Sequence, residues 1–161
     1  MPVRAKNFKE AVSQLKKAEK ALKRVDFFKQ KLLEIWLDCL TEAEAEKIIK
    51  ISRLPVIAVC RGALEKGSFR GTEEERINLL LRALQSGARY VDCGVQTDQK
   101  LLKMIKAACR KKRAKLIISE HIWQSCPSLE SLEGKTLESK KRGADIVKVA
   151  VMIKKWEENA L

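Results

Sequence analysis

A complete strand–helix–strand unit lies in residues 55–95, which read PVIAVCRGALEKGSFRGTEEERINLLLRALQSGARYVDCGV. Residues 55–60 are apolar or β-prone behind a proline, which predicts a buried parallel strand. A Thr-x-x-Glu capping box at 72–75 opens an amphipathic helix that stops at Gly87. A second apolar strand follows at 90–95. This order predicts two parallel strands connected by a right-handed helical crossover.

The same alternation extends in both directions from this unit. Helices are expected over 5–25, 42–51, 101–113 and 128–143, with Gly134 as a point of interruption in the last of these, and another helix after 150. Strands are expected at 32–37, 115–119 and 145–150, with a short one at 1–4. About six βα units with a parallel sheet fit two architectures, a doubly wound open sheet and an incomplete (β/α)8 barrel of the TIM type. Both place functional residues at the C-terminal ends of the strands.

The composition describes one domain that carries a large positive charge. The 161 residues include 34 Lys and Arg against 21 Asp and Glu, a formal charge of +13, and no linker-like segment divides them. We therefore treat residues 1–161 as a single domain, which is a partial TIM barrel if that architecture holds. The charge favours an acidic partner, but aromatic residues make up 5%, fewer than base-stacking surfaces use. Nucleic acid is therefore a disfavoured partner.

Cysteine, histidine and apolar residues exclude several kinds of site. The five cysteines are widely spaced and form no Cys-x-x-Cys pair, so we expect reduced, mostly packed thiols and a cytoplasmic location. One histidine leaves no multi-histidine metal site within the chain. No run of about 18 apolar residues is present, and the basic N-terminus has no apolar stretch behind it. Neither a membrane span nor a signal peptide is therefore expected.

A lysine inside one strand and a histidine at the end of the neighbouring strand indicate imine chemistry. Lys148 lies between Ile146-Val147 and Val149-Ala150, so its amine is either desolvated, which favours a nucleophile, or reaches the strand mouth. An edge strand, or a lysine that extends to solvent, would explain it without chemistry. His121 directly follows the strand at 115–119, and a lone histidine is often structural. Together, a buried lysine and a strand-end histidine supply the electron sink and the proton carrier of a Schiff-base lyase.

Charged residues after other strands are candidates for substrate contact. Arg61 follows the strand at 55–60 beside a glycine-containing loop, where its guanidinium could clamp a carboxylate; a surface salt bridge is the alternative. Glu34 and Asp38 bracket the preceding strand. The basic run 110–113 ends a helix, where positive charge offsets the helix dipole. We therefore favour a solvated helix end over a nucleic-acid patch for this run.

Six short segments fit one known family in both order and spacing. The most specific is Gly143-Ala-Asp-Ile-Val-Lys-Val-Ala150, with Ser119-Glu-His121 upstream of it. The others are Glu34-Ile-Trp-Leu-Asp38, Pro55-Val-Ile-Ala-Val-Cys-Arg61, Glu65-Lys-Gly67 with Gly71-Thr-Glu-Glu-Glu-Arg76, and Gly87-Ala-Arg-Tyr-Val-Asp92. Across about residues 30–152, these segments resemble type I 3-dehydroquinate dehydratase.

The resemblance implies a (β/α)8 barrel that converts 3-dehydroquinate to 3-dehydroshikimate in the shikimate pathway. It implies that Lys148 forms an imine with the substrate ketone, and that His121 removes the adjacent proton and later helps the hydroxyl leave. Glu34 and Arg61 match substrate-binding positions, and neither a metal nor an organic cofactor is implied. The expected partners are the carboxylate substrate and a second copy of the chain in a homodimer, with no membrane.

The sequence departs from the family pattern at two site positions and at its C-terminus. Trp36 stands where the family usually has a substrate-binding arginine, and Gly94 where it has a glutamate that steadies the catalytic histidine. The family continues through two more strands, so the chain resembles a family member that is truncated after its sixth strand. The barrel would then be open, and we expect a partner chain to cover its exposed strand edges. The alternative is a catalytically inactive remnant of the same fold. If it is correct, the substitution Gly94→Glu combined with addition of the missing C-terminal segment should raise the activity. A salt-sensitive nucleic-acid binder is the third hypothesis.

Overall fold

Strands and helices alternate along the chain. The computed structural model describes residues 1–26, 29–124 and 126–153. The strands are β1 (Pro2–Val3), β2 (Leu33–Trp36), β3 (Val56–Val59), β4 (Tyr90–Gly94), β5 (Lys115–Ile122) and β6 (Ile146–Val151). The helices are α1 (Phe8–Lys23), α2 (Glu42–Ile51), α3 (Glu73–Gln85), α4 (Gln99–Lys112) and α5 (Leu129–Lys141), with a short 3₁₀ helix η1 (Ala63–Glu65) after β3. The body of the helix predicted after residue 150 lies outside the described residues.

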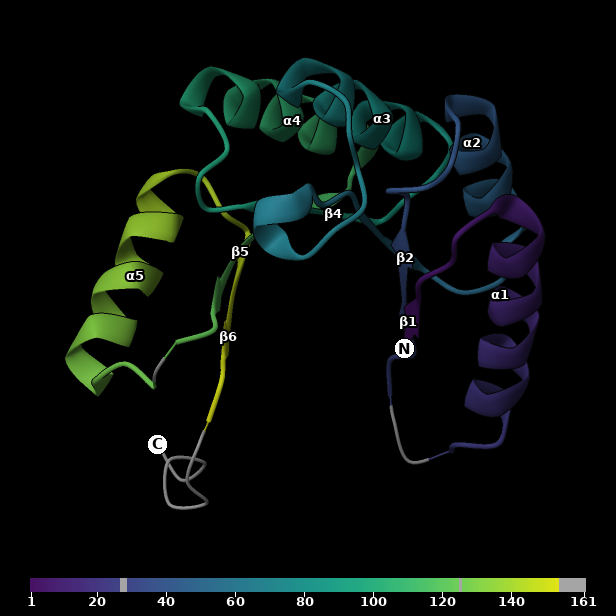
Figure 1. The fold of residues 1–161 in the computed structure, drawn as a ribbon, viewed down its shortest axis with the longest axis horizontal. Helices are drawn as coiled ribbons and strands as arrows, with labels where there is room; N and C mark the ends of the chain where they lie inside the picture. The colour runs from purple at the N-terminus through teal and green to yellow at the C-terminus, as the bar shows by residue number, and fades with distance from the viewer. Residues whose placement is uncertain (27–28, 125, 154–161) are drawn as a thin grey trace.

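The six strands form one curved parallel sheet. Their order in the sheet follows the chain, β1-β2-β3-β4-β5-β6, and every neighbouring pair is parallel. Figure 1 shows the sheet inside an arch of helices, with α1 and α2 on the right, α3 and α4 at the top and α5 on the left. A doubly wound sheet would carry helices on both faces. The incomplete (β/α) barrel predicted from the sequence is therefore confirmed, and the doubly wound alternative is wrong.

Local sequence explains where two of the helices begin. Thr41 and Thr72 accept hydrogen bonds from the backbone N–H groups of Glu44 and Glu75, and the two glutamates accept from the threonine N–H groups in return. Both predicted capping boxes are confirmed. The expected interruption at Gly134 is wrong, because α5 runs through it. A glycine in a helix interior weakens the helix but leaves its hydrogen-bond ladder possible.

The alternation of side chains along each strand gives the sheet two different faces. On β2, Leu33 and Ile35 face the helices and are fully buried, whereas Glu34 and Trp36 are half-buried on the inner face of the arch. The core between sheet and helices continues through outward-facing residues of the later strands and their helix partners, among them Ala58, Val91, Leu116, Ile118, Leu15, Ile48, Leu80 and Ile105. The inner face is thereby left for the polar side chains.

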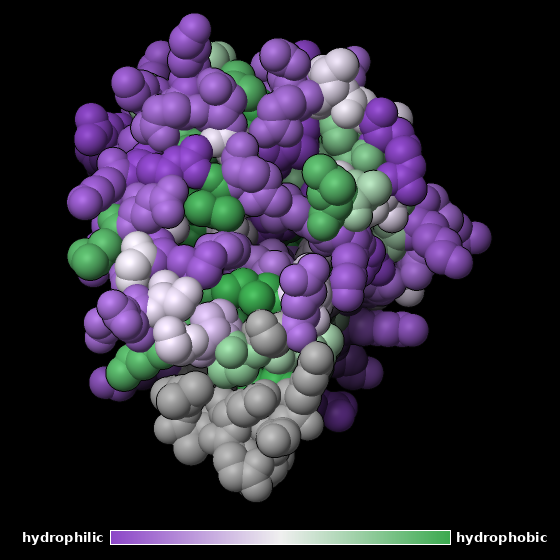
Figure 2. Space-filling view, turned by 60° about the vertical axis from the view of Figure 1, so that its left-hand side comes forward, coloured by the Kyte–Doolittle hydropathy of each residue, from purple (hydrophilic) through white to green (hydrophobic). Residues whose placement is uncertain are grey.

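Beside this core, α5 and β6 are more exposed than the other elements. Within α5 the buried side chain is Ser139, and Leu129 and Leu137 are more than half exposed. No residue of β6 is fully buried, and β6 is an edge strand of the described sheet. Figure 2, with this side turned forward, shows mostly hydrophilic side chains and small separate groups of apolar ones. The strand around Lys148 was expected to be buried on both faces, and this expectation is wrong.

All five cysteines are free thiols. Burial raises the pKa of Cys93 to about 12 and that of Cys109 to about 11, so neither is a reactive thiolate at neutral pH. Both side chains are packing groups of the core, as the sequence predicted. Within the described ranges, no helix combines the length and apolar character needed to cross a bilayer.

Replacing Gly134 by alanine should stabilise the protein. Position 134 lies in the interior of an exposed helix, and a Cβ added there meets no atom within 4 Å. Alanine should therefore raise the free energy of unfolding by up to about 1 kcal/mol. Urea denaturation followed by circular dichroism measures this change.

Gly87→Ala is the matched control. The space around Gly87 is equally open, but its φ of 109° is unfavourable for a residue with a Cβ, so this substitution should destabilise the protein. A loss of stability with Gly134→Ala would contradict the continuous α5.

Candidate active site

Curvature of the sheet brings a lysine on its last strand to a glutamate on its second. Lys148 Nζ lies 3.2 Å from Glu34 Oε2 and 3.5 Å from Asp92 Oδ2. In a flat sheet β2 and β6 would be roughly 19 Å apart, since adjacent strands are separated by about 4.8 Å. The contact therefore exists only because the sheet curls, and it gathers side chains from β2, β4 and β6 on the inner face.

Lys148 reaches this cluster from an edge strand. Its side chain is 38% exposed, so the strong desolvation expected for a lysine within a buried strand is absent. The side chain nevertheless points inward, because Lys148 pairs in register with Ser119 of β5, a fully buried residue that bonds to Asp92 on the inner face. Both carboxylate contacts described above follow from this orientation.

Glu34 is held by a tryptophan as well as by the lysine. Trp36 Nε1 donates a hydrogen bond of 2.8 Å to Glu34 Oε1, and the Arg4 guanidinium lies 4.5 Å above the indole ring. Partial burial opposes ionisation of Glu34. The hydrogen bond from Trp36 and the charge and hydrogen bond of Lys148 outweigh it and lower the pKa of the carboxyl group. Trp36 stands where the family usually has an arginine, and its indole N–H stabilises the ionised form of Glu34.

The Arg61 guanidinium joins three strand ends. It is 1% exposed, and its NH2 group donates to Asp92 Oδ1 at 2.6 Å and to the hydroxyl of Ser119, while its NH1 group contacts the Glu65 carboxylate. Ser119 Oγ also donates to Asp92 Oδ1 at 2.6 Å. The surface salt bridge considered for Arg61 is therefore wrong, because both NH groups are engaged inside the protein.

The loop after β3 is folded so that Glu65 faces inward. Asp38 accepts hydrogen bonds from the backbone N–H groups of Arg61 and Ser68, at 2.7 and 3.0 Å, and so ties the two ends of the loop together. Gly67 packs against Arg61 so closely that an added Cβ would lie 1.9 Å from the Arg61 carbonyl oxygen. Asp38, which the sequence analysis noted after the strand at 32–37, thus holds the backbone of this loop.

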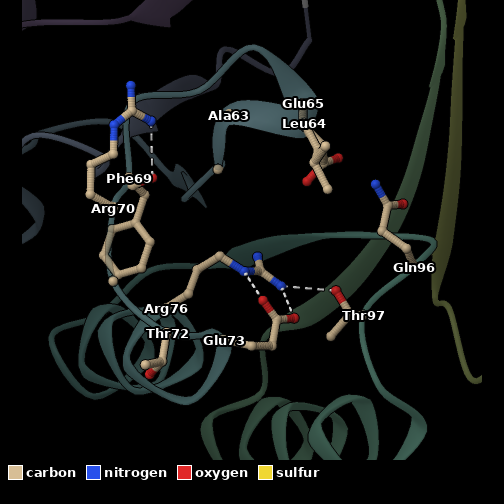
Figure 3. Close-up of a pocket in the computed structure, with 12 residues that line it drawn as sticks. Ala63, Leu64, Glu65, Phe69, Arg70, Thr72, Glu73, Arg76, Gln96 and Thr97 are labelled. Atoms are coloured by element: carbon tan, nitrogen blue, oxygen red, sulfur yellow. Dashed lines mark hydrogen bonds and ion pairs between the residues drawn. The ribbon is translucent and has the colours of Figure 1, made fainter.

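A separate pocket lies beside η1 and includes neither Lys148 nor His121. Figure 3 shows Arg76 from α3 in this pocket, with hydrogen bonds to the Glu73 carboxylate and to Thr97. Arg76 NH1 also donates to the carbonyl oxygen of Cys60 at 3.1 Å. These contacts anchor the end of β3 to α3 and to the segment after β4, which fixes the start of the loop that carries Glu65.

His121 lies within β5, whereas the sequence placed it just after a strand ending at 119. The strand reaches Ile122 because its last residues pair with β6, His121 with Ala150. His121 therefore shares the inner face with Ser119, and Trp123 stacks on its ring at 5.6 Å between centroids. Burial lowers the pKa of the imidazole, and the nearby charges of Arg61 and Lys148 lower it further.

All four residues selected from the sequence face the interior, together with three that lie at strand ends or in a family segment but were given no role. Asp92, Ser119 and Glu65 occupy the centre of the cluster, and the first two are fully buried. Asp92 carried a detectable signal, since a carboxylate between Val91 and Cys93 in a buried strand needs a cation. Glu65 lies in one of the segments that resemble the family, but its inward orientation depends on the fold of a loop and has no local signal. Among the described residues, no group of three His, Cys, Asp or Glu side chains is placed to hold a metal ion.

Fold and site together define a (β/α)-barrel protein with a polar site at the C-terminal ends of its strands. The chain belongs to the type I 3-dehydroquinase family, whose model, described as "Type I 3-dehydroquinase", matches residues 2–161.

Two relatives illustrate the range of sequence similarity. The chloroplastic bifunctional 3-dehydroquinate dehydratase/shikimate dehydrogenase of Arabidopsis thaliana is 37% identical over 123 residues, which cover 74% of this chain and 20% of that protein. The 3-dehydroquinate dehydratase of Methanocaldococcus jannaschii is 32% identical over 145 residues, which cover 89% of this chain and 63% of that protein. The chain thus spans less than two thirds of the length of both relatives.

Solved structures with a similar fold include the type I 3-dehydroquinate dehydratase of Clostridium difficile. It superposes with a TM-score of 0.83 at 19% identity, covering 98% of this chain and 64% of that one. The 3-dehydroquinate dehydratase of Geobacillus kaustophilus gives a TM-score of 0.81 at 24% identity. At these identities the likeness establishes the fold, and it places the curled six-stranded sheet within a barrel of this kind.

Removing the Arg61 guanidinium should destabilise the protein strongly. Arg61→Met removes the hydrogen-bonded cation of the buried Asp92 carboxylate and leaves it only the half-exposed Lys148 ammonium at 3.5 Å. Loss of one partner of a buried ion pair typically costs about 3–5 kcal/mol. Urea denaturation measures the loss.

Arg82→Met is the control, because Arg82 pairs with Glu42 and Glu46 on the surface, where water screens the charges. Equal losses in the two variants would contradict a central role for Arg61.

Proposed function

We propose that the chain dehydrates 3-dehydroquinate to 3-dehydroshikimate through an imine on Lys148. The observation that carries the proposal is the position of Lys148 Nζ, between two carboxylates on the inner face and on the strand next to that of His121. Membership of the type I 3-dehydroquinase family and the names of the relatives support the same substrate. The shikimate pathway is the corresponding metabolic setting.

The first step joins Lys148 to the substrate. The neutral amine attacks the ketone carbon, a carbinolamine forms, and loss of water leaves an iminium in which Nζ is bonded to that carbon. Glu34 and Asp92, at 3.2 and 3.5 Å from Nζ, are placed to accept the proton that the ammonium must lose before attack. The positive iminium then remains between the same two carboxylates, which stabilise it.

The second step requires a base near the iminium. His121, held neutral by its surroundings, removes a proton from the carbon adjacent to the iminium, and the electron pair passes into an enamine. The protonated imidazole then gives that proton to the departing hydroxyl group, which leaves as water. Hydrolysis of the conjugated iminium releases the product and restores the Lys148 amine.

Substrate contact is assigned to Glu34 and Arg61. Glu34 is ionised and half-buried, so it can accept hydrogen bonds from substrate hydroxyl groups in addition to its Lys148 contact. Arg61 Nε makes no hydrogen bond with any described residue, so the guanidinium retains a donor for a substrate carboxylate. Glu65, on the loop, is the Arg61 partner that can move to admit that carboxylate without disturbing a strand. The homodimer and the cytoplasmic location remain predictions of the sequence.

Borohydride reduction should trap the proposed imine. Incubating the chain with 3-dehydroquinate and borohydride should add the mass of one reduced substrate, and peptide mapping should place it on Lys148. Lys148→Ala should abolish the adduct. Lys135→Ala should retain it, because Lys135 pairs with Glu120 away from the Lys148 cluster.

Turnover is followed in parallel at the absorbance of the conjugated product. A folded chain that gives neither adduct nor product would overturn the proposed function and would favour the inactive remnant. An adduct without turnover would retain the imine step and place the defect in proton transfer.

The pH dependence should report the neutral form of His121. Because burial and two nearby cations lower the pKa of the imidazole, it stays a competent base below the ordinary histidine value of about 6.5. The ratio kcat/KM should therefore fall toward acid pH with a midpoint below that value. A midpoint above it would show that the imidazolium is stabilised in the free protein and would contradict this assignment.

A further inference from the structure

A groove on the outer side of the sheet lies between α1 and the end of α2. It has a volume of about 560 Å³, and Figure 1 shows the two helices next to each other outside the sheet. Its floor is apolar: Val12 is half-buried, Leu15 is buried, and Ile51, the last residue of α2, is 42% exposed. The inner face, where Lys148 lies, is on the other side of the sheet, so the proposed reaction does not use this groove.

Positive charge borders the apolar floor. Lys16, Lys20 and Lys23 follow one another on α1 at spacings of four and three residues, which places them along one side of the helix, and Arg53 follows α2. All four are exposed, and no carboxylate of a described residue lies within 4.0 Å of their charged groups. The one carboxylate that lines the groove, Glu19, accepts a hydrogen bond of 2.7 Å from the backbone N–H of Arg53.

The neighbouring surface between α2 and α3 is different, because its charges are paired. Glu46 contacts both Lys50 and Arg82, and Arg82 also contacts Glu42. The groove beside α1 therefore holds part of the formal charge of +13 in a form that no described side chain neutralises. Unpaired cations around an apolar recess favour a partner that brings both carboxylates and apolar side chains.

This combination distinguishes among anionic partners. Phosphate groups of a nucleic acid could contact the lysines, but they would leave the apolar floor without a partner. A bilayer takes up apolar side chains that project from a surface, whereas the apolar side chains here lie in a recess between two helices. A second copy of the chain would bring a like-charged groove against this one, and the two would repel each other.

We propose that this groove binds an acidic amphipathic helix of a partner protein. Apolar residues three and four positions apart on that helix pack on the floor, and the carboxylates beside them pair with the three lysines and the arginine. From Val12 to Lys23, α1 rises about 16 Å at about 1.5 Å per residue, so a partner helix of about three turns matches the groove. The inference goes beyond the proposed reaction and does not rest on it.

A designed peptide serves as the probe, and fluorescence anisotropy measures its binding. The peptide carries a fluorescein label and has about 15 residues, with leucine along one helical face and glutamate and alanine elsewhere. A scrambled peptide of the same composition keeps the charge but loses the apolar face. The amphipathic peptide should bind at least about 10-fold more tightly, because it alone can cover the floor while its carboxylates reach the rim.

Variants of the groove test its rim and its floor separately. Lys16→Gln, Lys20→Gln and Lys23→Gln combined in one variant remove three exposed cations and should weaken binding of the amphipathic peptide about 10-fold. Ile51→Gln removes exposed apolar surface without a change of charge and should weaken it about fivefold. Circular dichroism and urea denaturation check that both variants are folded.

The controls carry equivalent changes on α4. Lys103→Gln, Lys111→Gln and Lys112→Gln combined remove three exposed charges, and Met104→Gln removes an apolar side chain that is 50% exposed. Neither control should weaken peptide binding more than about twofold, because α4 does not line the groove. Turnover and borohydride trapping on Lys148 should match those of the unaltered chain in all four variants, which keeps this question apart from the proposed function.

Three results would overturn the inference. The first is that the amphipathic and scrambled peptides bind equally, or that neither binds, which would remove the apolar floor from the interaction. The second is that the groove and α4 lysine variants weaken binding equally, which would indicate diffuse charge. The third is that a DNA duplex of about 20 base pairs, or vesicles containing phosphatidylserine, bind more tightly than the peptide and lose binding in the groove lysine variant, which would assign the groove to another class of partner.

Discussion

The buried guanidinium of Arg61 holds the interior of this protein together. It bonds Asp92 on β4 and Ser119 on β5 and contacts Glu65 on η1, so three successive strand ends and one loop share a single cation. A buried charge of this kind is tolerated only when its partners are fixed with good geometry. The positions of the carboxylates are therefore coupled, and the loop that supplies Glu65 is held by the same contact that orders Asp92.

From Arg61, opposite charges alternate across the curved inner face. Asp92 contacts both Arg61 and Lys148, and Lys148 in turn contacts Glu34 on β2. This arrangement places an amine between two carboxylates, which suits an imine that becomes cationic. It depends on the curl of the sheet, because the strands that carry Glu34 and Lys148 are separated by three others in sheet order.

Two positions that differ from the family pattern are filled by neighbouring groups. Trp36 cannot supply the positive charge of an arginine, but its indole N–H bonds Glu34, and Arg4 lies over its ring. Gly94 provides no carboxylate, but Glu65 occupies its space and faces His121. Arg4 and Glu65 each come from a different segment of the chain, so their proximity to these positions is visible only in the folded structure.

The sequence by itself determined the order of strands and helices and the starts of α2 and α3, because capping boxes and apolar periodicity act over a few residues. It also singled out Lys148, His121, Glu34 and Arg61 as candidates, because they are polar residues in or beside apolar strands. Only the tertiary structure decided that β5 extends past His121, that β6 is a half-exposed edge, and that Arg61 bonds Asp92 and contacts Glu65. Those features depend on pairing between strands and on the curl of the sheet, which join residues far apart in the chain and leave no local pattern.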